Sequence, residues 1–233
     1  MVAPDLSAGL LIFGGASSGK TSILMTLALG MAERFSADDL HLYCIDAGDR
    51  RLDPLAQLPH TGTVTHADDP EGVTRLVLEL GWEIDRRNAA AGKPDGTQRA
   101  AGTEPAIVVM IDNIAILRST LGAENAWDAF EQMLRQGHTV GLHFVVTATE
   151  PDDLAATFTG GETRQLVLRL DNPSDYERLG VDNIHAGAAA GRAHRSGDGA
   201  EMQLVEPPSD VTAAIADLDV EVPDERPPLG GQG

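Results

Sequence analysis

The chain is poor in cysteine, in aromatic residues and in long apolar runs, and each shortage excludes a class of protein. A single cysteine, Cys44, rules out an internal disulfide framework, and its apolar neighbours predict a buried structural thiol. Aromatic residues amount to 4%, so a core must be built mainly from Leu, Val, Ile and Ala. No apolar run approaches the roughly 20 residues that span a bilayer, and the first residues lack the basic flank of a secretory signal. These absences favour a soluble, cytoplasmic protein.

Positive charge is also scarce. The chain carries 36 acidic and 17 basic residues, a net charge of −19, and its only lysines are Lys20 and Lys93. Nucleic-acid affinity comes chiefly from neutralising phosphates with Lys and Arg, so the composition argues against DNA as a partner, although it leaves room for a local arginine patch. The seven histidines are scattered without the spacing of a metal site.

A glycine-rich octamer near the N-terminus fits the P-loop pattern GxxxxGK[ST] at every fixed position. Its residues are Gly14, Gly15, Ala16, Ser17, Ser18, Gly19, Lys20 and Thr21, and Ser22 follows. The apolar residues 9–13 before it predict a buried strand, and residues 22–29 after it predict a helix. In that context backbone N–H groups face a phosphate chain, the lysine adds a charge and the threonine hydroxyl reaches Mg²⁺. We predict that these nine residues bind ATP; the alternative is a glycine-rich turn with a surface lysine.

Apolar segments alternate with helical patterns along the rest of the chain. Strands are predicted at residues 40–45, 61–66, 106–112, 142–149, 165–170 and 201–205, and helices at 71–87 and around 127–134. This alternation predicts an α/β fold with a mainly parallel sheet flanked by helices and an antiparallel edge near the C-terminus. Residues 89–104 are predicted to be a loop. We assign the domain to residues 1–206 and predict a largely disordered acidic tail at 207–233, in which 211–218 could form a short helix.

A second acid is needed to hold Mg²⁺ beside a P-loop, and Asp112 is the candidate because it closes the most apolar predicted strand. Its alternative role is to cap the next turn. Thr21 and Asp112 are therefore the predicted metal ligands. The next residue, Asn113, can orient a water molecule but cannot take its proton, so hydrolysis is in doubt.

A resemblance to a known family extends over roughly residues 9–205. Leu40–Asp46, followed by Leu52–His60, resembles the second-strand region of FtsK/SpoIIIE-type motor ATPases, where an aspartate at the strand end precedes a leucine- and proline-rich segment ending in Pro-His. Further fragments follow in the family's order: Glu83–Arg87, Ala148-Thr149, Arg164–Leu170, Asp175–Gly180 and Gly191–Ala193. The chain most resembles the EccC branch, the multi-ATPase motor of actinobacterial type VII secretion, and this resemblance implies a RecA-like P-loop NTPase fold.

The resemblance also implies a function and partners. It implies an ATP-binding module with Mg²⁺, neighbouring ATPase modules and small helical-hairpin export substrates, placed in a secretion complex at the inner face of the membrane. The family's DNA-pumping members carry Glu after the metal-binding Asp and Gln-Arg-Pro after Ala-Thr, whereas this chain has Asn113 and Glu150-Pro151-Asp152. Asn113 and Glu150 are thus the candidate catalytic positions, with weak or absent hydrolysis expected. A DNA translocase module and a nucleotide-free pseudo-ATPase scaffold stay open as alternatives.

Ring ATPases place an arginine from a neighbouring subunit against the γ-phosphate. Arg164, Arg178 and Arg192 lie in the half of the chain where this could occur, and the alternative for each is an ordinary solvated surface residue. Trp82 and Trp127 stand among apolar residues in helical segments, and we predict core packing for both rather than a partner-binding role.

Overall fold

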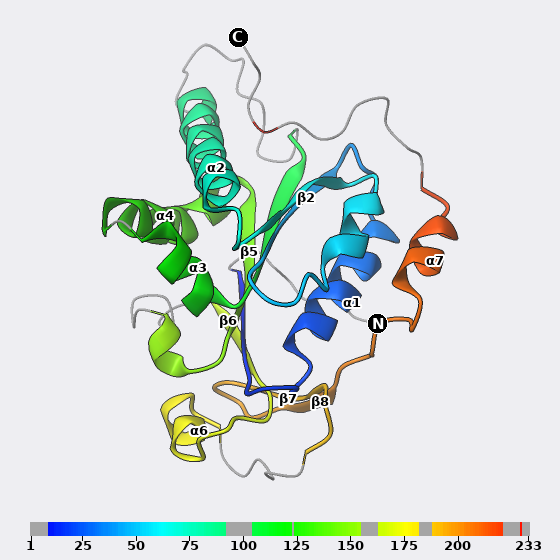
Figure 1. The fold of residues 1–233 in the computed structure, drawn as a ribbon, viewed down its shortest axis with the longest axis vertical. Coiled ribbons are helices and arrows are strands. Elements are labelled where there is room, and N and C mark those ends of the chain that lie inside the picture. The colour runs from blue at the N-terminus through cyan, green and yellow to red at the C-terminus, as the bar shows by residue number, and fades with distance from the viewer. Residues whose placement is uncertain are drawn as a thin grey trace.

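The strands of the computed structural model form one sheet in the order β3-β2-β4-β5-β1-β6-β7-β8 (Figure 1). The structure describes residues 9–91, 104–122, 124–154, 163–181, 188–220 and 229. The strands are β1 (Leu10–Phe13), β2 (Leu40–Asp46), β3 (Thr61–His66), β4 (Ala106–Asp112), β5 (Leu142–Ala148), β6 (Arg164–Val167), β7 (Arg192–Arg195) and β8 (Glu201–Gln203). The α-helices are α1 (Lys20–Ala32), α2 (Pro70–Ala91), α3 (Ile114–Leu121), α4 (Glu124–Gln136), α6 (Ser174–Arg178) and α7 (Val211–Ala216), and the 3-10 helices are η1 (Asp53–Gln57), η2 (Gly137–Val140) and η3 (Pro151–Asp153).

The sheet is parallel from β3 to β6 and antiparallel at its β7–β8 edge. This confirms the predicted mainly parallel α/β sheet flanked by helices. Because parallel strands end at the same edge of a sheet, the segments after β1, β2, β4, β5 and β6 meet there. Strand β7 and helix α3 were not predicted from the sequence; both are short, β7 follows an alanine- and glycine-rich segment at 186–191, and α3 follows Asn113.

Alternating residues of the strands supply two cores, one on each face. Helices α2, α3 and α4 pack with one face of the sheet, and α1, η1 and α7 pack with the other (Figure 1). Cys44 is fully buried in the second core, and burial raises the pKa of its thiol to about 12, as befits a structural thiol. None of the helices in the described part of the chain combines the length and apolarity needed to traverse a bilayer.

Helix α7 lies within the segment predicted to be a tail. Its N-cap is Asp210, whose side chain accepts a hydrogen bond from the Ala213 N–H. Val211 and Ile215, one turn apart, are buried in the core that lies between α1 and the sheet. Residues 221–228 and 230–233 of that segment, like residues 92–103 of the predicted loop, lie outside the described residues.

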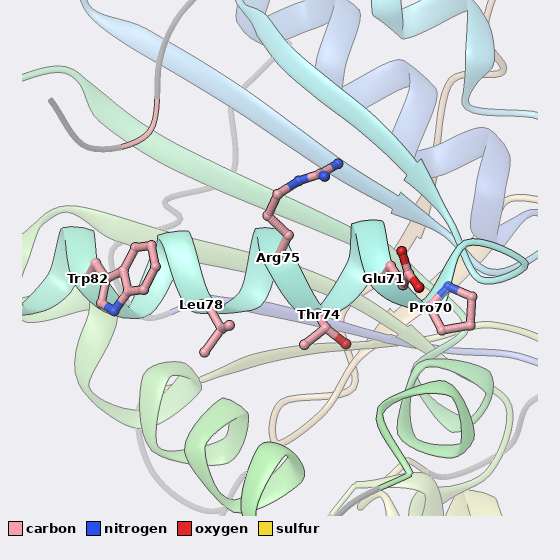
Figure 2. A pocket seen from close by; sticks show the side chains of 6 residues that line it. All are labelled: Pro70, Glu71, Thr74, Arg75, Leu78 and Trp82. Atoms are coloured by element: carbon pink, nitrogen blue, oxygen red, sulfur yellow. The ribbon is translucent and has the colours of Figure 1, made fainter. Parts of the chain in front are cut away.

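The two tryptophans differ sharply in their surroundings. Trp127 is 8% exposed and packs against Phe130 in a tilted arrangement, with 5.5 Å between ring centroids, as predicted for a core residue. The prediction of core packing for Trp82 was wrong, because this side chain is 65% exposed on α2. It follows Leu78, itself 51% exposed, by one helical turn, and Figure 2 shows both side chains on the outer surface of α2, away from the apolar stripe that contacts the sheet.

A buried ion pair fastens α2 to its neighbours. Glu83 and Arg87 are both buried, and the Glu83 Oε1 to Arg87 Nε distance is 2.7 Å. The Arg87 guanidinium also donates to the carbonyls of Val140 and Pro105, each at 2.9 Å, so it links α2 to η2 and to the start of β4. Burial on its own would raise the pKa of Glu83, but hydrogen bonds from Arg86 and Arg87 together outweigh burial and lower it.

We expect Arg87→Ala to lower the free energy of unfolding by about 3–5 kcal/mol, because it removes the buried partner of the Glu83 carboxylate, which then keeps only the partly exposed Arg86, and because it leaves the Val140 and Pro105 carbonyls without their donor. Urea unfolding at neutral pH measures the loss. Because the folded-state pKa of Glu83 is lowered, the pair's contribution is fully present above the ordinary carboxyl pKa and disappears as the pH falls through the folded value. The difference between the two proteins should therefore shrink in acid.

Arg86→Ala is the matched control. Arg86 binds the same carboxylate at 2.7 Å, but its side chain is 44% exposed, so its loss should cost about 1 kcal/mol or less. Equal losses in the two variants would contradict a role for Arg87 as the buried partner.

Candidate nucleotide-binding site

The glycine-rich loop between β1 and α1 is held by backbone hydrogen bonds from three sides. The Gly14 N–H donates to the carbonyl of Ala148 at the end of β5 (3.0 Å), and the Gly15 N–H donates to the carbonyl of Arg169 after β6 (2.8 Å). The Gly191 N–H, just before β7, donates to the Ser18 carbonyl at 3.0 Å. Segments far apart in the chain thus fix the conformation of the loop.

The backbone angle of Gly19 requires a glycine, and Gly15 leaves space for a neighbouring side chain. Gly19 has φ +105°, a left-handed conformation that side chains rarely adopt, and a Cβ there would lie 3.0 Å from the Gly191 nitrogen. A Cβ on Gly15 would lie 2.4 Å from Oδ1 of Asp171. In addition, the Ser18 hydroxyl is buried and has no hydrogen-bond partner among the described residues.

Lys20 begins α1, and its ammonium folds back onto the loop. Nζ donates to the carbonyls of Gly14 at 2.5 Å and Gly15 at 3.0 Å. Burial lowers the pKa of Lys20 and outweighs the opposite effect of the nearby carboxylates of Asp112, Asp171 and Asp153. An anion bound in the loop would favour the charged ammonium.

The structure brings Thr21 and Asp112 together although 91 positions separate them. The Thr21 hydroxyl donates to Asp112 Oδ2 and the Thr147 hydroxyl donates to Asp112 Oδ1, both at 2.7 Å. Asp112 is only 5% exposed. A hydroxyl and a carboxylate at the mouth of the loop are the hard oxygen ligands that Mg²⁺ takes, so the residues present fit the predicted metal.

Asn113 directly follows the β4 aspartate in a left-handed backbone conformation, with φ +68°. Its N–H donates to the Thr147 hydroxyl at 2.8 Å, and its side chain does not cap α3. Asparagine tolerates this conformation better than most residues. The left-handed turn therefore helps to explain the residue type at this position.

Glu150, the second candidate catalytic residue, is exposed at the end of β5. Asp153, which the sequence analysis did not single out, lies closer to the site: its Oδ2 accepts hydrogen bonds from the N–H groups of Thr149 and Glu150, at 2.8 and 2.9 Å. Asp153, and not Glu150, is among the carboxylates that act on the pKa of Lys20. The only indication of Asp153 in the sequence was that an acidic residue stands in the turn three positions after Glu150.

The three arginines considered for contact with a γ-phosphate lie in three different elements, β6, α6 and β7. Arg164 is paired in register with Leu10, at the opposite end of β1 from the loop. Arg178 forms ion pairs with Asp152 and Asp175. Arg192 pairs with Glu201 at 2.7 Å, and it directly follows the Gly191 that contacts the loop.

Another arginine, Arg51, extends from the loop after β2 toward the start of α1. Its Nη2 lies 3.4 Å from the Ser22 hydroxyl. Arg51 was not among the candidate site residues predicted from the sequence. It adds positive charge at the helix end of the candidate site.

Comparison with known proteins identifies relatives. Residues 2–92 match the FtsK/SpoIIIE family. The chain is 30% identical over 181 residues to the ESX-5 secretion system protein EccC5 of Mycobacterium marinum and 26% identical over 206 residues to the ESX secretion system protein EccC of Geobacillus thermodenitrificans. These alignments cover 69% and 85% of the chain but only 12% and 14% of the relatives. The chain thus corresponds to a small part of such proteins.

Two solved structures share the fold. One contains ATPases 2 and 3 of Thermomonospora curvata EccC in complex with a signal sequence peptide, with a TM-score of 0.80 and 22% identity over 94% of the chain and 43% of the solved chain. The other contains ATPases 2 and 3 of EssC from Geobacillus thermodenitrificans, with a TM-score of 0.79 and 23% identity over 91% and 44%.

We expect Thr147→Val to lower the free energy of unfolding by about 1–3 kcal/mol, because it removes one hydroxyl partner of Asp112 and leaves the Asn113 N–H without its acceptor. Thermal or urea unfolding measures the change. Thr26→Val is the control, since its hydroxyl makes an exposed bond to the Val205 carbonyl and its loss should stay within about 0.5 kcal/mol. If Thr26→Val lowers the free energy of unfolding as much as Thr147→Val does, the hydrogen bonds around the Asp112 carboxylate make no special contribution to stability.

Proposed function

The chain carries an FtsK/SpoIIIE-family domain homologous to the ATPase modules of ESX, or type VII, secretion proteins, and from this premise we propose that it is an ATP-binding module of an EccC-like secretion motor. The observation that carries the proposal is the meeting of Lys20, Thr21 and Asp112 at one mouth of the glycine-rich loop. A structural glycine turn with a surface lysine would not need a partly buried ammonium beside a buried carboxylate.

We assign roles to the residues of this mouth. The N–H groups of residues 14–22 and the α1 N-terminus bind the phosphate chain, and Lys20 moves from the loop carbonyls to the β- and γ-phosphates. Thr21 and Asp112 hold Mg²⁺, which neutralises phosphate charge when bound. Thr147 keeps the Asp112 carboxylate oriented by its hydrogen bond.

The residue that would activate the attacking water differs from the Glu of the family's DNA-pumping members. Asn113 can hold a water molecule but cannot accept its proton, and the Asp153 carboxylate already accepts two backbone hydrogen bonds. We therefore propose that nucleotide binding, with weak or absent hydrolysis in isolation, is coupled to assembly with neighbouring modules and to docking of export substrates.

Small helical-hairpin export substrates and neighbouring ATPase modules are the proposed partners, at the inner face of the membrane. The Thermomonospora curvata EccC complex with a signal sequence peptide supports this choice. A DNA translocase is disfavoured by the net charge of −19, and a nucleotide-free scaffold is disfavoured by the intact Lys20 and Thr21.

Lys20→Ala should abolish ATP binding, because it removes the ammonium that contacts the phosphate loop. Calorimetric titration with Mg²⁺ and ATP compares it with the native chain. Lys93→Ala, which removes the chain's other lysine, should bind as the native chain does. Equal ATP affinity for the native chain and Lys20→Ala would refute the proposal.

Single-turnover hydrolysis should be very slow in the native chain and rise up to about 100-fold in Asn113→Glu, since a general base typically contributes about 10²–10⁴-fold. Circular dichroism checks that Glu is tolerated at this left-handed position. Glu150→Gln should change little. Rapid native turnover that collapses only in Glu150→Gln would instead make Glu150 the base.

A further inference from the structure

Asp171 lies directly against the phosphate-binding loop, although nothing in the loop motif specifies an acid there. The Ala16 N–H donates to Asp171 Oδ2 at 3.3 Å. A Cβ built on Gly15 would lie 2.4 Å from Oδ1 and 2.7 Å from Oδ2. Both carboxylate oxygens therefore occupy the space that the missing side chain of Gly15 leaves open.

The backbone before Asp171 is anchored, so the carboxylate is presented to the loop by a defined segment. Arg169 contributes two bonds: its carbonyl accepts from the Gly15 N–H at 2.8 Å, and its Nη2 donates to the Ala16 carbonyl at 2.9 Å. The Leu170 N–H donates to the hydroxyl of buried Tyr176 at 2.7 Å. A side chain on a mobile loop would lack these attachments.

The carboxylate lies at one particular end of the site. Lys20 reaches the β- and γ-phosphates in P-loop proteins, and here its Nζ is 3.0 Å from the carbonyl of Gly15, the residue against which Asp171 packs. Arg51 lies at the other end, beside Ser22 at the start of α1. Asp171 thus adds negative charge beside Ala16 and Gly15, at the end of the loop where the terminal phosphate is expected.

We infer that Asp171 is a specificity-determining residue of the nucleotide site, which weakens binding of the terminal phosphate of ATP relative to ADP. This inference rests on the proposed nucleotide-binding function and deepens it. The γ-phosphate of ATP adds negative charge next to a carboxylate that ADP does not approach as closely, and like charges at short range repel. Asp171 has to turn away from Ala16 before ATP binds fully, whereas ADP leaves that contact in place.

The test is Asp171→Asn, which removes the charge and keeps an oxygen that can accept from the Ala16 N–H. Calorimetric titrations with Mg²⁺–ATP and Mg²⁺–ADP should show ATP affinity raised about tenfold, equivalent to about 1.4 kcal/mol, and ADP affinity raised by no more than about threefold. The gain for ATP should shrink at high salt, because salt screens an exposed charge.

Asp217→Asn is the matched control. It removes one negative charge from an exposed position at the C-terminal end of α7 and should leave both affinities unchanged. Asp171→Glu, which keeps the charge, should retain the native preference between ATP and ADP.

The outcomes separate this inference from the proposed function. If the native chain binds ATP, and Asp171→Asn binds ATP with equal or lower affinity or improves ATP and ADP equally, Asp171 does not discriminate between them. If neither the native chain nor Asp171→Asn binds any nucleotide, the proposed function itself is refuted and the inference falls with it.

Discussion

The buried carboxylate of Asp112 is the constraint on which the site depends. It accepts hydrogen bonds from the hydroxyls of Thr21 and Thr147, and Thr147 in turn accepts from the N–H of Asn113. One carboxylate thereby ties the start of α1 to the ends of β4 and β5. Any metal ion that binds Thr21 must exchange with this bond, so occupancy of the loop changes the contacts among three elements of the core.

The acids around the loop make the site selective by charge. Asp46 and Asp112 lie near each other across Gly48, and Asp153 and Asp171 act on Lys20 from other sides. A nucleotide without a metal ion would bring its negative charges into this group of carboxylates. Under the proposed function, these carboxylates would favour a nucleotide whose phosphates are already partly neutralised by a divalent cation.

The glycine-rich loop, the parallel strands and the place of Asp112 at a strand end could be predicted because their signals are local. A motif of fixed spacing and an apolar run that closes on an acid lie within a few residues of each other. Thr147, Asp153 and Asp171 could not be identified in this way, since each reaches Lys20 or Asp112 only through the order of strands in the sheet. Trp82 shows the converse limit: an aromatic residue among apolar neighbours suggested a core position, but the helical period places it outward.

The position of β1 in the sheet has a consequence for how the protein is made. Leu10 pairs in register with Val145 on one side and with Arg164 on the other, whereas β2 pairs with β3 and β4, which are closer in sequence. During synthesis from the N-terminus, β2, β3 and β4 can associate while β1 still waits for both of its neighbours. The glycine-rich loop is therefore synthesised well before β5 and β6, the two strands that flank β1 and hold the loop in place.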